Sequence, residues 1–336
     1  MKKSGLINFA SMVFYLLLIS TLFTDCKKTE NPIKYPFGTF PDTVINIADI
    51  NSAYDDYNIG LYQIGETLPI IFSSNRKSSG GQFDLEQGSI SFLFDQTTGV
   101  FGFGSKMTTD QFLTRLISKA VTPGNDFGPY RLFSTVDGFE YLLLASSNTE
   151  GNLDLYYLKN QPAAGTDIPL VTGPYPVKLM NTGSDDAYIS FNLTQDTAYY
   201  CSNKDGNFDI FMLNKPADKD LTSWFNLDFA SPVKTDSINS DYEDKCPFIY
   251  KKIMIFTSDR PGGLGGYDLY YSIFKNGKWS SPLNMGPRIN SSYDEYRPVI
   301  GVNPEFTNYW MMFSSNRPGG KGGFDLYFTG VDFSSK

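Results

Sequence analysis

The sequence predicts an all-β protein assembled from five copies of one unit. A phrase of the form Phe-Ser-Ser-Asn-Arg recurs along the chain, and each copy is followed by an aspartate and a hydrophobic residue. The five phrases begin at Phe72, Ala145, Tyr200, Phe256 and Phe313. Aromatic residues make up 16% of the 336 residues, and 30 glycines and 19 prolines interrupt the chain. Aromatic residues favour strands, and frequent turn residues separate many short strands. Internal similarity of this kind is typical of repeat architectures.

Each unit has the pattern of a small antiparallel sheet. In the fifth unit an acidic turn leads into a first strand at 297–302, and an apolar second strand follows at 309–313. A glycine-rich turn then precedes a third strand at 324–329. The fourth unit adds a fourth strand at 279–285. Four antiparallel strands per repeat are typical of one propeller blade, so the sequence predicts a five-bladed β-propeller.

The two ends of the chain indicate how the ring closes. The fifth unit reaches Lys336 with no room for a fourth strand, whereas the segment from Val44 aligns with the fourth-strand segment from Leu283. We expect this N-terminal strand to join the last blade and close the ring. Closure would also remove an exposed sheet edge.

The first unit is irregular. It contains an insertion at 88–110, in which four phenylalanines at even spacing suggest an extra hairpin: Phe92, Phe94, Phe101 and Phe103. Residues 111–120 fit either a short helix or the fourth strand of that blade, and we expect a strand.

Two sets of acidic residues recur once per unit. The first set directly follows the turn, and we expect it to accept backbone N–H groups there: Asp84, Asp154, Asp209, Asp268 and Asp325. The second set precedes each first strand: Asp56, Asp126, Asp186, Asp244 and Glu295. We expect structural ion pairs between this second set and Arg76, Arg260 and Arg317. The alternative is an acidic rim that binds a cation or a basic partner.

Composition excludes several functions. The net charge of −8 argues against nucleic acid, whose phosphates need a basic surface. The chain contains no histidine, which removes Ser-His and Cys-His nucleophiles and the commonest zinc ligand. We therefore expect no metal and no cofactor. Cys201 and Cys246 fit two buried free thiols better than a disulfide.

The N-terminus has the pattern of an export signal. Lys2 and Lys3 precede a mostly apolar, uncharged run at 5–24, as in secretory signals. The segment 22–26 resembles a bacterial lipoprotein signal, which implies lipidation of Cys26, although Asp25 stands where that family prefers a small residue. An uncleaved anchor or ordinary secretion stays open. The expected organisation is a lipoprotein-type signal peptide at 1–25, a tether at 26–40 and the propeller at 41–336.

The phrases Phe256–Tyr271 and Phe313–Phe328 resemble the TolB-type, WD40-like propeller repeat of bacterial envelope proteins. The resemblance covers about residues 44–332, but the N-terminal domain of TolB and a peptidoglycan-binding domain have no counterpart in the sequence. It implies an outer-membrane lipoprotein of a Gram-negative bacterium, facing the periplasm or the surface.

The function expected from these patterns is non-enzymatic. The recurring acids obey the repeat symmetry, whereas the carboxylates of a glycoside hydrolase have different tasks and should break it. We therefore expect a lipid-anchored scaffold whose propeller binds an envelope protein. The alternative is a propeller that binds or hydrolyses carbohydrate at its central channel.

Overall fold

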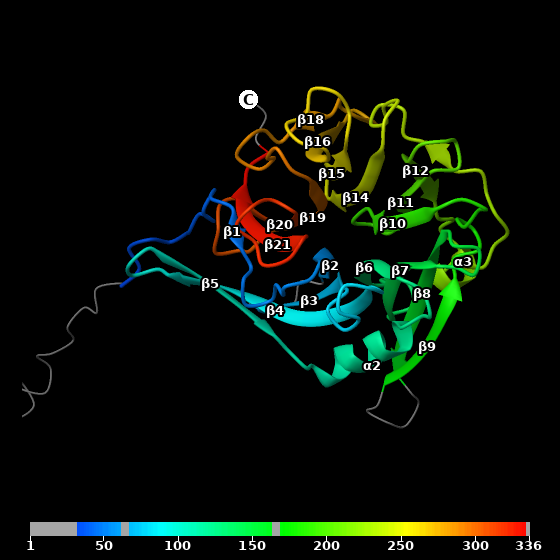
Figure 1. Cartoon of the computed structure of the whole chain (residues 1–336), viewed down its shortest axis with the longest axis horizontal. Coiled ribbons are helices and arrows are strands. Elements are labelled where there is room, and N and C mark those ends of the chain that lie inside the picture. The colour runs from blue at the N-terminus through cyan, green and yellow to red at the C-terminus, as the bar shows by residue number, and fades with distance from the viewer. Residues whose placement is uncertain (1–31, 62–66, 163–168, 334–336) are drawn as a thin grey trace, which may run out of the picture.

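The chain forms five antiparallel sheets around a common centre (Figure 1). The computed structural model describes residues 32–61, 67–162 and 169–333. The first strand of each sheet contacts the first strands of both neighbouring sheets, so these five strands surround the centre. The protein is a five-bladed β-propeller, and the predicted fold class is confirmed.

The blades run in chain order. The first contains β2 (Asp56–Leu61), β3 (Thr67–Ser74), β4 (Asp84–Asp95) and β5 (Val100–Met107). The second contains β6 (Asp126–Phe133), β7 (Glu140–Ser147), β8 (Leu153–Pro162) and β9 (Pro169–Pro176). The third contains β10 (Asp186–Phe191), β11 (Thr197–Ser202), β12 (Asp209–Asn214) and β13 (Val233–Lys234). The fourth contains β14 (Asp244–Tyr250), β15 (Ile253–Ser258), β16 (Asp268–Lys275), β17 (Lys278–Trp279) and β18 (Leu283–Asn284). The fifth contains β19 (Glu295–Gly301), β20 (Tyr309–Ser315), β21 (Asp325–Val331) and β1 (Ile45–Asn46).

The N-terminal strand closes the last blade, as predicted. β1 pairs antiparallel with β21, with Ile45 opposite Phe328. Phe40, the last residue of the predicted tether, is buried and stacks on Phe306 with ring centroids 3.8 Å apart. Its N–H donates to Asn308 Oδ1 (2.8 Å). The segment that precedes β1 therefore belongs to the packed core of the fifth blade.

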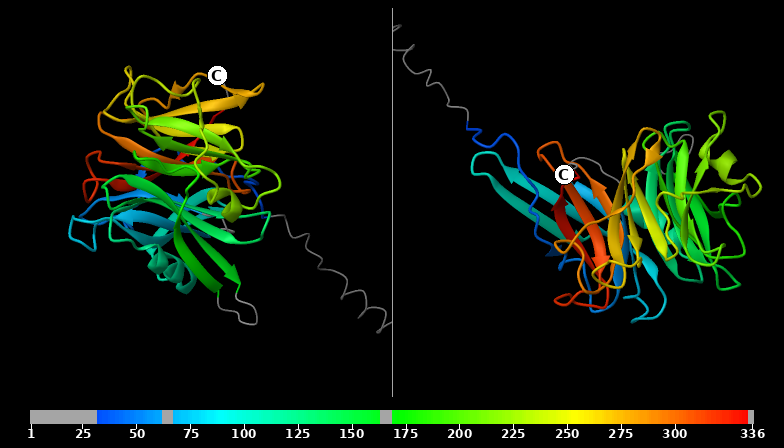
Figure 2. Two further views of the ribbon diagram at one scale, coloured as in Figure 1. Left: turned by 90° about the vertical axis from the view of Figure 1, so that its right-hand side faces the viewer. Right: turned by 90° about the horizontal axis from the view of Figure 1, so that it is seen from above.

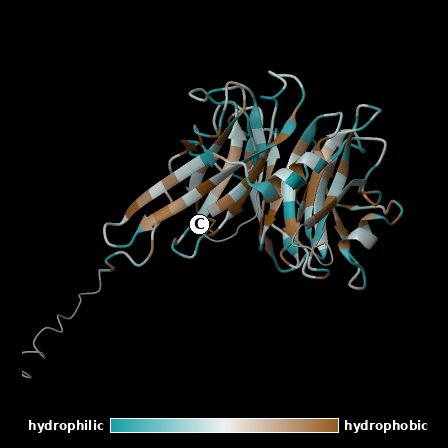
Figure 3. Ribbon diagram, turned by 90° about the horizontal axis from the view of Figure 1, so that it is seen from below, coloured by the Kyte–Doolittle hydropathy of each residue, from teal (hydrophilic) through white to brown (hydrophobic). Residues whose placement is uncertain are grey.

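The core lies between blades. β15 is buried along its whole length, because blades pack face to face and cover both sides of a central strand. This burial explains the apolar second strands of the repeat. A hydropathy view shows apolar bands along the strands and polar loops at their ends (Figure 3).

The insertion of the first unit forms the long hairpin of β4 and β5, which extends beyond the other blades (Figure 2). We call this hairpin the arm. Its inward face carries the four evenly spaced phenylalanines, which pack on Phe40, Phe306 and Phe328. Its returning strand, β5, is the fourth strand of the first blade.

The expected strand at 111–120 is wrong: these residues form α2 (Gln111–Ala120). Asp110 caps the helix by accepting the N–H groups of Phe112 and Leu113 at 2.9 Å, a strongly preferred arrangement. A buried stripe packs α2 against the first two blades, and it consists of Leu113, Leu116, Ile117 and Ala120. A second, short helix is α3 (Leu221–Phe225). No helix in the described ranges is long and apolar enough to cross a membrane.

Candidate functional site: the mouth of the central channel

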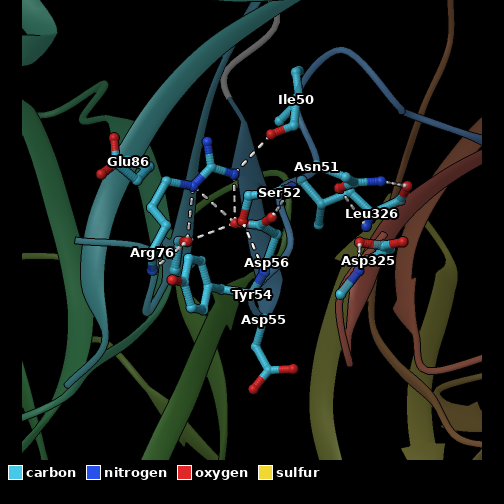
Figure 4. Close-up of polar contacts among 12 residues, drawn as sticks. Ile50, Asn51, Ser52, Tyr54, Asp55, Asp56, Arg76, Glu86, Asp325 and Leu326 are labelled. Carbon is cyan, nitrogen blue, oxygen red and sulfur yellow. Dashed lines mark hydrogen bonds and ion pairs between the residues drawn. The ribbon is translucent and has the colours of Figure 1, made fainter. Parts of the chain in front are cut away.

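Each first strand begins at a buried acid whose oxygens are bonded within its own blade. Figure 4 shows this arrangement for Asp56. Asp56 Oδ1 accepts from Ser74 Oγ (2.5 Å) and Arg76 Nη2 (2.5 Å), and Oδ2 accepts from the Ser52 N–H (2.5 Å). Arg76 Nη2 also donates to the carbonyl of Ile50 (2.7 Å). One ion pair thus joins the acidic turn to the second strand.

The same geometry recurs in the fourth and fifth blades. Asp244 pairs with Arg260, and Glu295 pairs with Arg317 at 2.8 Å. All five first-strand acids have no exposed side-chain surface: Asp56, Asp126, Asp186, Asp244 and Glu295. Because these side chains are buried, a partner at the propeller surface cannot reach them, which favours the structural role over the binding rim.

The second and third blades lack this arginine, having Thr149 and Lys204 instead. Asp126 accepts from Thr122 Oγ1 and Ser146 Oγ, both at 2.9 Å. These hydroxyls only partly offset burial, which raises the pKa of Asp126 to about 6. Burial likewise raises the pKa of Asp186 to about 6. Among the described residues, neither of these two buried carboxyls has a cation partner.

Two of the aspartates at the start of the third strands accept backbone N–H groups of the turns before them. Asp268 accepts the N–H groups of Leu264 (2.7 Å) and Gly265 (3.1 Å), and Asp325 accepts those of Lys321 and Gly322. In the shorter turn of the second blade, Asp154 accepts from the side chain of Asn148 (Nδ2, 3.0 Å), whereas Asp209 pairs with Lys234 Nζ on the neighbouring strand β13 (2.5 Å). Asp84 occupies the same place at the start of β4.

We call the residue before each first-strand acid the seam residue. In four of the five blades it joins its blade to the preceding one. These four seam residues accept an N–H from the preceding blade in the ring at 2.7–2.9 Å: Asp55 from Phe324, Asn125 from Phe83, Asp185 from Leu153 and Asp294 from Tyr267. The Asn of the repeated phrase supports the seam in turn, since Asn203 Nδ2 donates to Asp185 Oδ2 (3.0 Å). The phrase is therefore part of the contact between blades.

The fourth blade departs from this arrangement. Its seam residue is Glu243, and the Asn of the phrase is replaced by Asp259. The Glu243 N–H donates to Asp259 Oδ1 (2.8 Å), as the Asp55, Asp185 and Asp294 N–H groups donate to an asparagine, so the fourth blade has a carboxylate where those three blades have an amide. Glu243 Oε2 pairs with Lys245 Nζ at 2.7 Å. Lys245 Nζ in turn bonds Tyr267 Oη at 3.2 Å.

Half-buried aromatic rings surround the residues at the starts of the first strands, Lys245 among them. We call this ring the channel mouth, and its aromatic members are Tyr57, Phe83, Phe127, Phe208, Tyr267, Tyr296 and Phe324. All of them except Phe208 are connected by ring contacts, with centroids 5.0 Å apart for Tyr57 and Phe83 and 5.6 Å apart for Tyr267 and Tyr296. Lys245 Nζ lies 4.5 Å from the Phe208 centroid and 5.1 Å from that of Tyr267.

Below the mouth, the centre is filled by side chains. The second residue after each acid has a left-handed φ between 49° and 59° and lies in a bulge of the first strand: Asn58, Gly128, Tyr188, Cys246 and Arg297. These residues are all buried, and the Arg297 guanidinium lies 5.5 Å from the Tyr188 ring. Left-handed non-glycine residues store backbone strain. These buried side chains therefore close the centre of the propeller below the mouth.

The two cysteines of the propeller are buried and unreactive in this structure. Cys201 and Cys246 are free and buried, as expected. Burial raises the pKa of the Cys246 thiol to about 12, so it stays protonated. Within the described ranges, no cluster of three or more acids or cysteines is arranged to hold a metal.

Comparisons with known proteins support the fold but identify no family. No protein-family model and no curated protein matches the sequence. A thermostable family-43 glycoside hydrolase is similar in structure, with a TM-score of 0.56 and 12% identity over 86% of this chain and 92% of that one. An endo-arabinase from Bacteroides thetaiotaomicron has a TM-score of 0.51 and 11% identity over 89% and 98%. The catalytic domain of a GH62 α-L-arabinofuranosidase from Coprinopsis cinerea has a TM-score of 0.51 and 10% identity over 88% and 98%.

These neighbours correct the expected function. The prediction of a non-enzymatic scaffold is contradicted, because the three similar solved structures named above are glycoside hydrolases. They favour the alternative, a propeller that acts on carbohydrate. They also leave the TolB-type resemblance supported only as far as the propeller itself. At 10–12% identity the likeness shows the fold, and the activity has to be argued from the residues of the channel mouth.

Proposed function

We propose that the protein binds a carbohydrate at the channel mouth and hydrolyses a glycosidic bond there. The observation that carries this proposal is the altered seam of the fourth blade, where Glu243 and Asp259 replace an acid and an amide. Glycoside hydrolysis commonly uses two carboxylates with different tasks. Paired acids that break the repeat symmetry are what such chemistry requires.

The surroundings of the two carboxylates suit a sugar. Phe208 and Tyr267 are half-buried aromatic rings against Lys245, the partner of Glu243, and aromatic faces offer apolar area with little loss of side-chain entropy. Lys245 bonds both Glu243 and Tyr267, so it fixes the carboxylate relative to the ring. In this proposal Glu243 and Asp259 carry the acid and base roles, Lys245 positions Glu243, and the two rings hold the sugar.

The proposal also places the protein in the cell envelope. The apolar run at 5–24 followed by Cys26 supports export and attachment through a lipid on that cysteine. The TolB-type phrases support the same location and an envelope protein as a further partner. Replacing Cys26 with Ala should move the protein out of the membrane fraction; if it stays there at the mass of the precursor, the lipoprotein assignment is wrong.

Activity should be tested on the full chain by reducing-sugar release from a panel of arabinans, xylans, mannans and envelope polysaccharides. Glu243→Gln and Asp259→Asn should each lower the rate at least about 100-fold, the range expected for loss of an acid–base group, with unchanged melting temperature. Asp185→Asn is the matched control, because Asn125 already occupies the equivalent seam of the second blade. It should retain activity. If no polysaccharide is cleaved, or if Glu243→Gln behaves like the control, the proposal fails.

A further inference from the structure

The tip of the arm gathers apolar side chains that nothing in the described structure covers. Leu93 and Val100, near the turn of the hairpin, are each 62% exposed. Ile33, Tyr35 and Phe37, in the segment that enters the propeller, are 46–60% exposed. We call these five residues the tip patch. Patches of this kind on a soluble surface mark interaction sites.

Hairpin geometry explains why the arm has an apolar outer face. Leu93 lies opposite Gly102, and Val100 lies opposite Asp95, so Leu93 and Val100 point to the same face of the hairpin. The phenylalanines that alternate with them point to the other face, where they pack on the core. The outer face therefore has no part in the core of the propeller.

The N-terminal segment is held to the tip of the arm. The N–H groups of Lys34 and Tyr35 both donate to the carbonyl of Gln96 at 2.9 Å. The Tyr35 ring lies against Gly99, where a Cβ atom would be 3.1 Å from it. The tip patch is thus one surface built from two segments, and its location is fixed by backbone hydrogen bonds.

The position of the chain before this patch indicates what covers it. Only six residues separate Cys26 from Ile33, so a membrane-attached Cys26 lies at most about 25 Å from the patch in extended chain. Figures 1 and 2 show the described chain beginning beside the end of the arm, and Figure 3 shows apolar bands along the arm. Aromatic and aliphatic side chains with a lysine nearby suit the headgroup boundary of a bilayer.

We propose that the tip patch rests on a lipid bilayer and fixes how the propeller is oriented on the membrane. The arm then acts as a second contact beside the N-terminal attachment, and a single attachment gains strength from a second contact. This inference rests on the membrane attachment proposed above and not on glycoside hydrolysis.

The test uses the full chain on vesicles of brominated phosphatidylcholine, whose acyl chains quench nearby indoles. Leu93→Trp places a probe in the patch, and Leu193→Trp is the control, since Leu193 is 72% exposed in the turn between β10 and β11. The native tryptophans are all buried and give a constant background: Trp224, Trp279 and Trp310. Emission of the probe at 93 should fall about twofold, because interfacial side chains sit about 5–10 Å deep, whereas emission of the probe at 193 should not change.

Flotation of the same samples separates the two proposals. If the protein floats with the vesicles but the probe at 93 is unquenched, the bilayer contact is overturned while the attachment stands; a dimer would then cover the patch. If the protein does not float, both are overturned. Val100→Trp should be quenched like the probe at 93, and adding Leu93→Asp to that variant should abolish its quenching.

Discussion

Replacing Asp126 with Asn should stabilise the protein at neutral pH, whereas the equivalent change at Asp244 should destabilise it. Both carboxyls begin a first strand, and both are buried. Asp244 has the Arg260 guanidinium as its partner, while Asp126 has only hydroxyls and one N–H. The two substitutions therefore make the same chemical change at equivalent positions of the fold, with and without a cation.

The magnitude follows from the pKa of Asp126. Burial raises this pKa from 3.8 to about 6, so between these values the folded protein keeps a proton that the unfolded chain has released. The free energy of unfolding then falls as the pH rises from about 4 to about 6, by up to about 3 kcal/mol. Asp126→Asn removes this fall, so the variant should be more stable than the parent by up to that amount at pH 8 and similar to it at pH 3.5.

Asp244→Asn should instead lose about 3–5 kcal/mol, the usual cost of removing one partner from a buried ion pair. Urea denaturation of both variants at pH 3.5, 5 and 8 measures the differences. The reasoning is refuted if Asp126→Asn is as destabilising as Asp244→Asn at pH 8, or if its effect does not change between pH 3.5 and 8.

Three further predictions concern the centre and the closure. Arg297→Met should leave the free energy of unfolding unchanged or raise it, because Nε and Nη1 have no partner among the described residues and apolar replacements of buried charges are often neutral or stabilising; a loss above about 2 kcal/mol would indicate a missed partner. Cys201 and Cys246 should react with iodoacetamide only in denaturant, since burial raises both thiol pKa values, and mass spectrometry of the native protein should find no adduct. Deleting residues 36–50 removes β1 and Phe40, so the melting temperature should fall and aggregation increase; equal solubility and heat stability would contradict the closure.

Repetition made most of the fold predictable. The recurring phrases mark the second and third strands of each blade, and the alignment of Val44 with Leu283 predicts the closing strand. The repeat template also caused the error at α2. A fourth strand was expected after the insertion, but β5 inside the insertion already supplies it. The helix was readable from Asp110 as a cap and from the buried spacing that begins at Leu113.

The candidate site could be predicted only in part. The replacement of Asn by Asp259 is visible in the aligned phrases, but its meaning depends on the backbone hydrogen bond that places it beside Glu243. The filled centre gave no signal in the sequence. Tyr188 and Arg297 adopt a left-handed φ although their residue types do not favour it, so the surrounding bulge, and not local preference, fixes their backbone.

The two-residue strand β1 has a consequence for how the protein folds. Ile45 of β1 pairs with Phe328 of its partner β21, so the first strand of the described propeller must wait for the last. No folding intermediate can complete the ring until β21 is available. Pairing across such a sequence separation is slow to form, and exposed strand edges in the meantime favour aggregation.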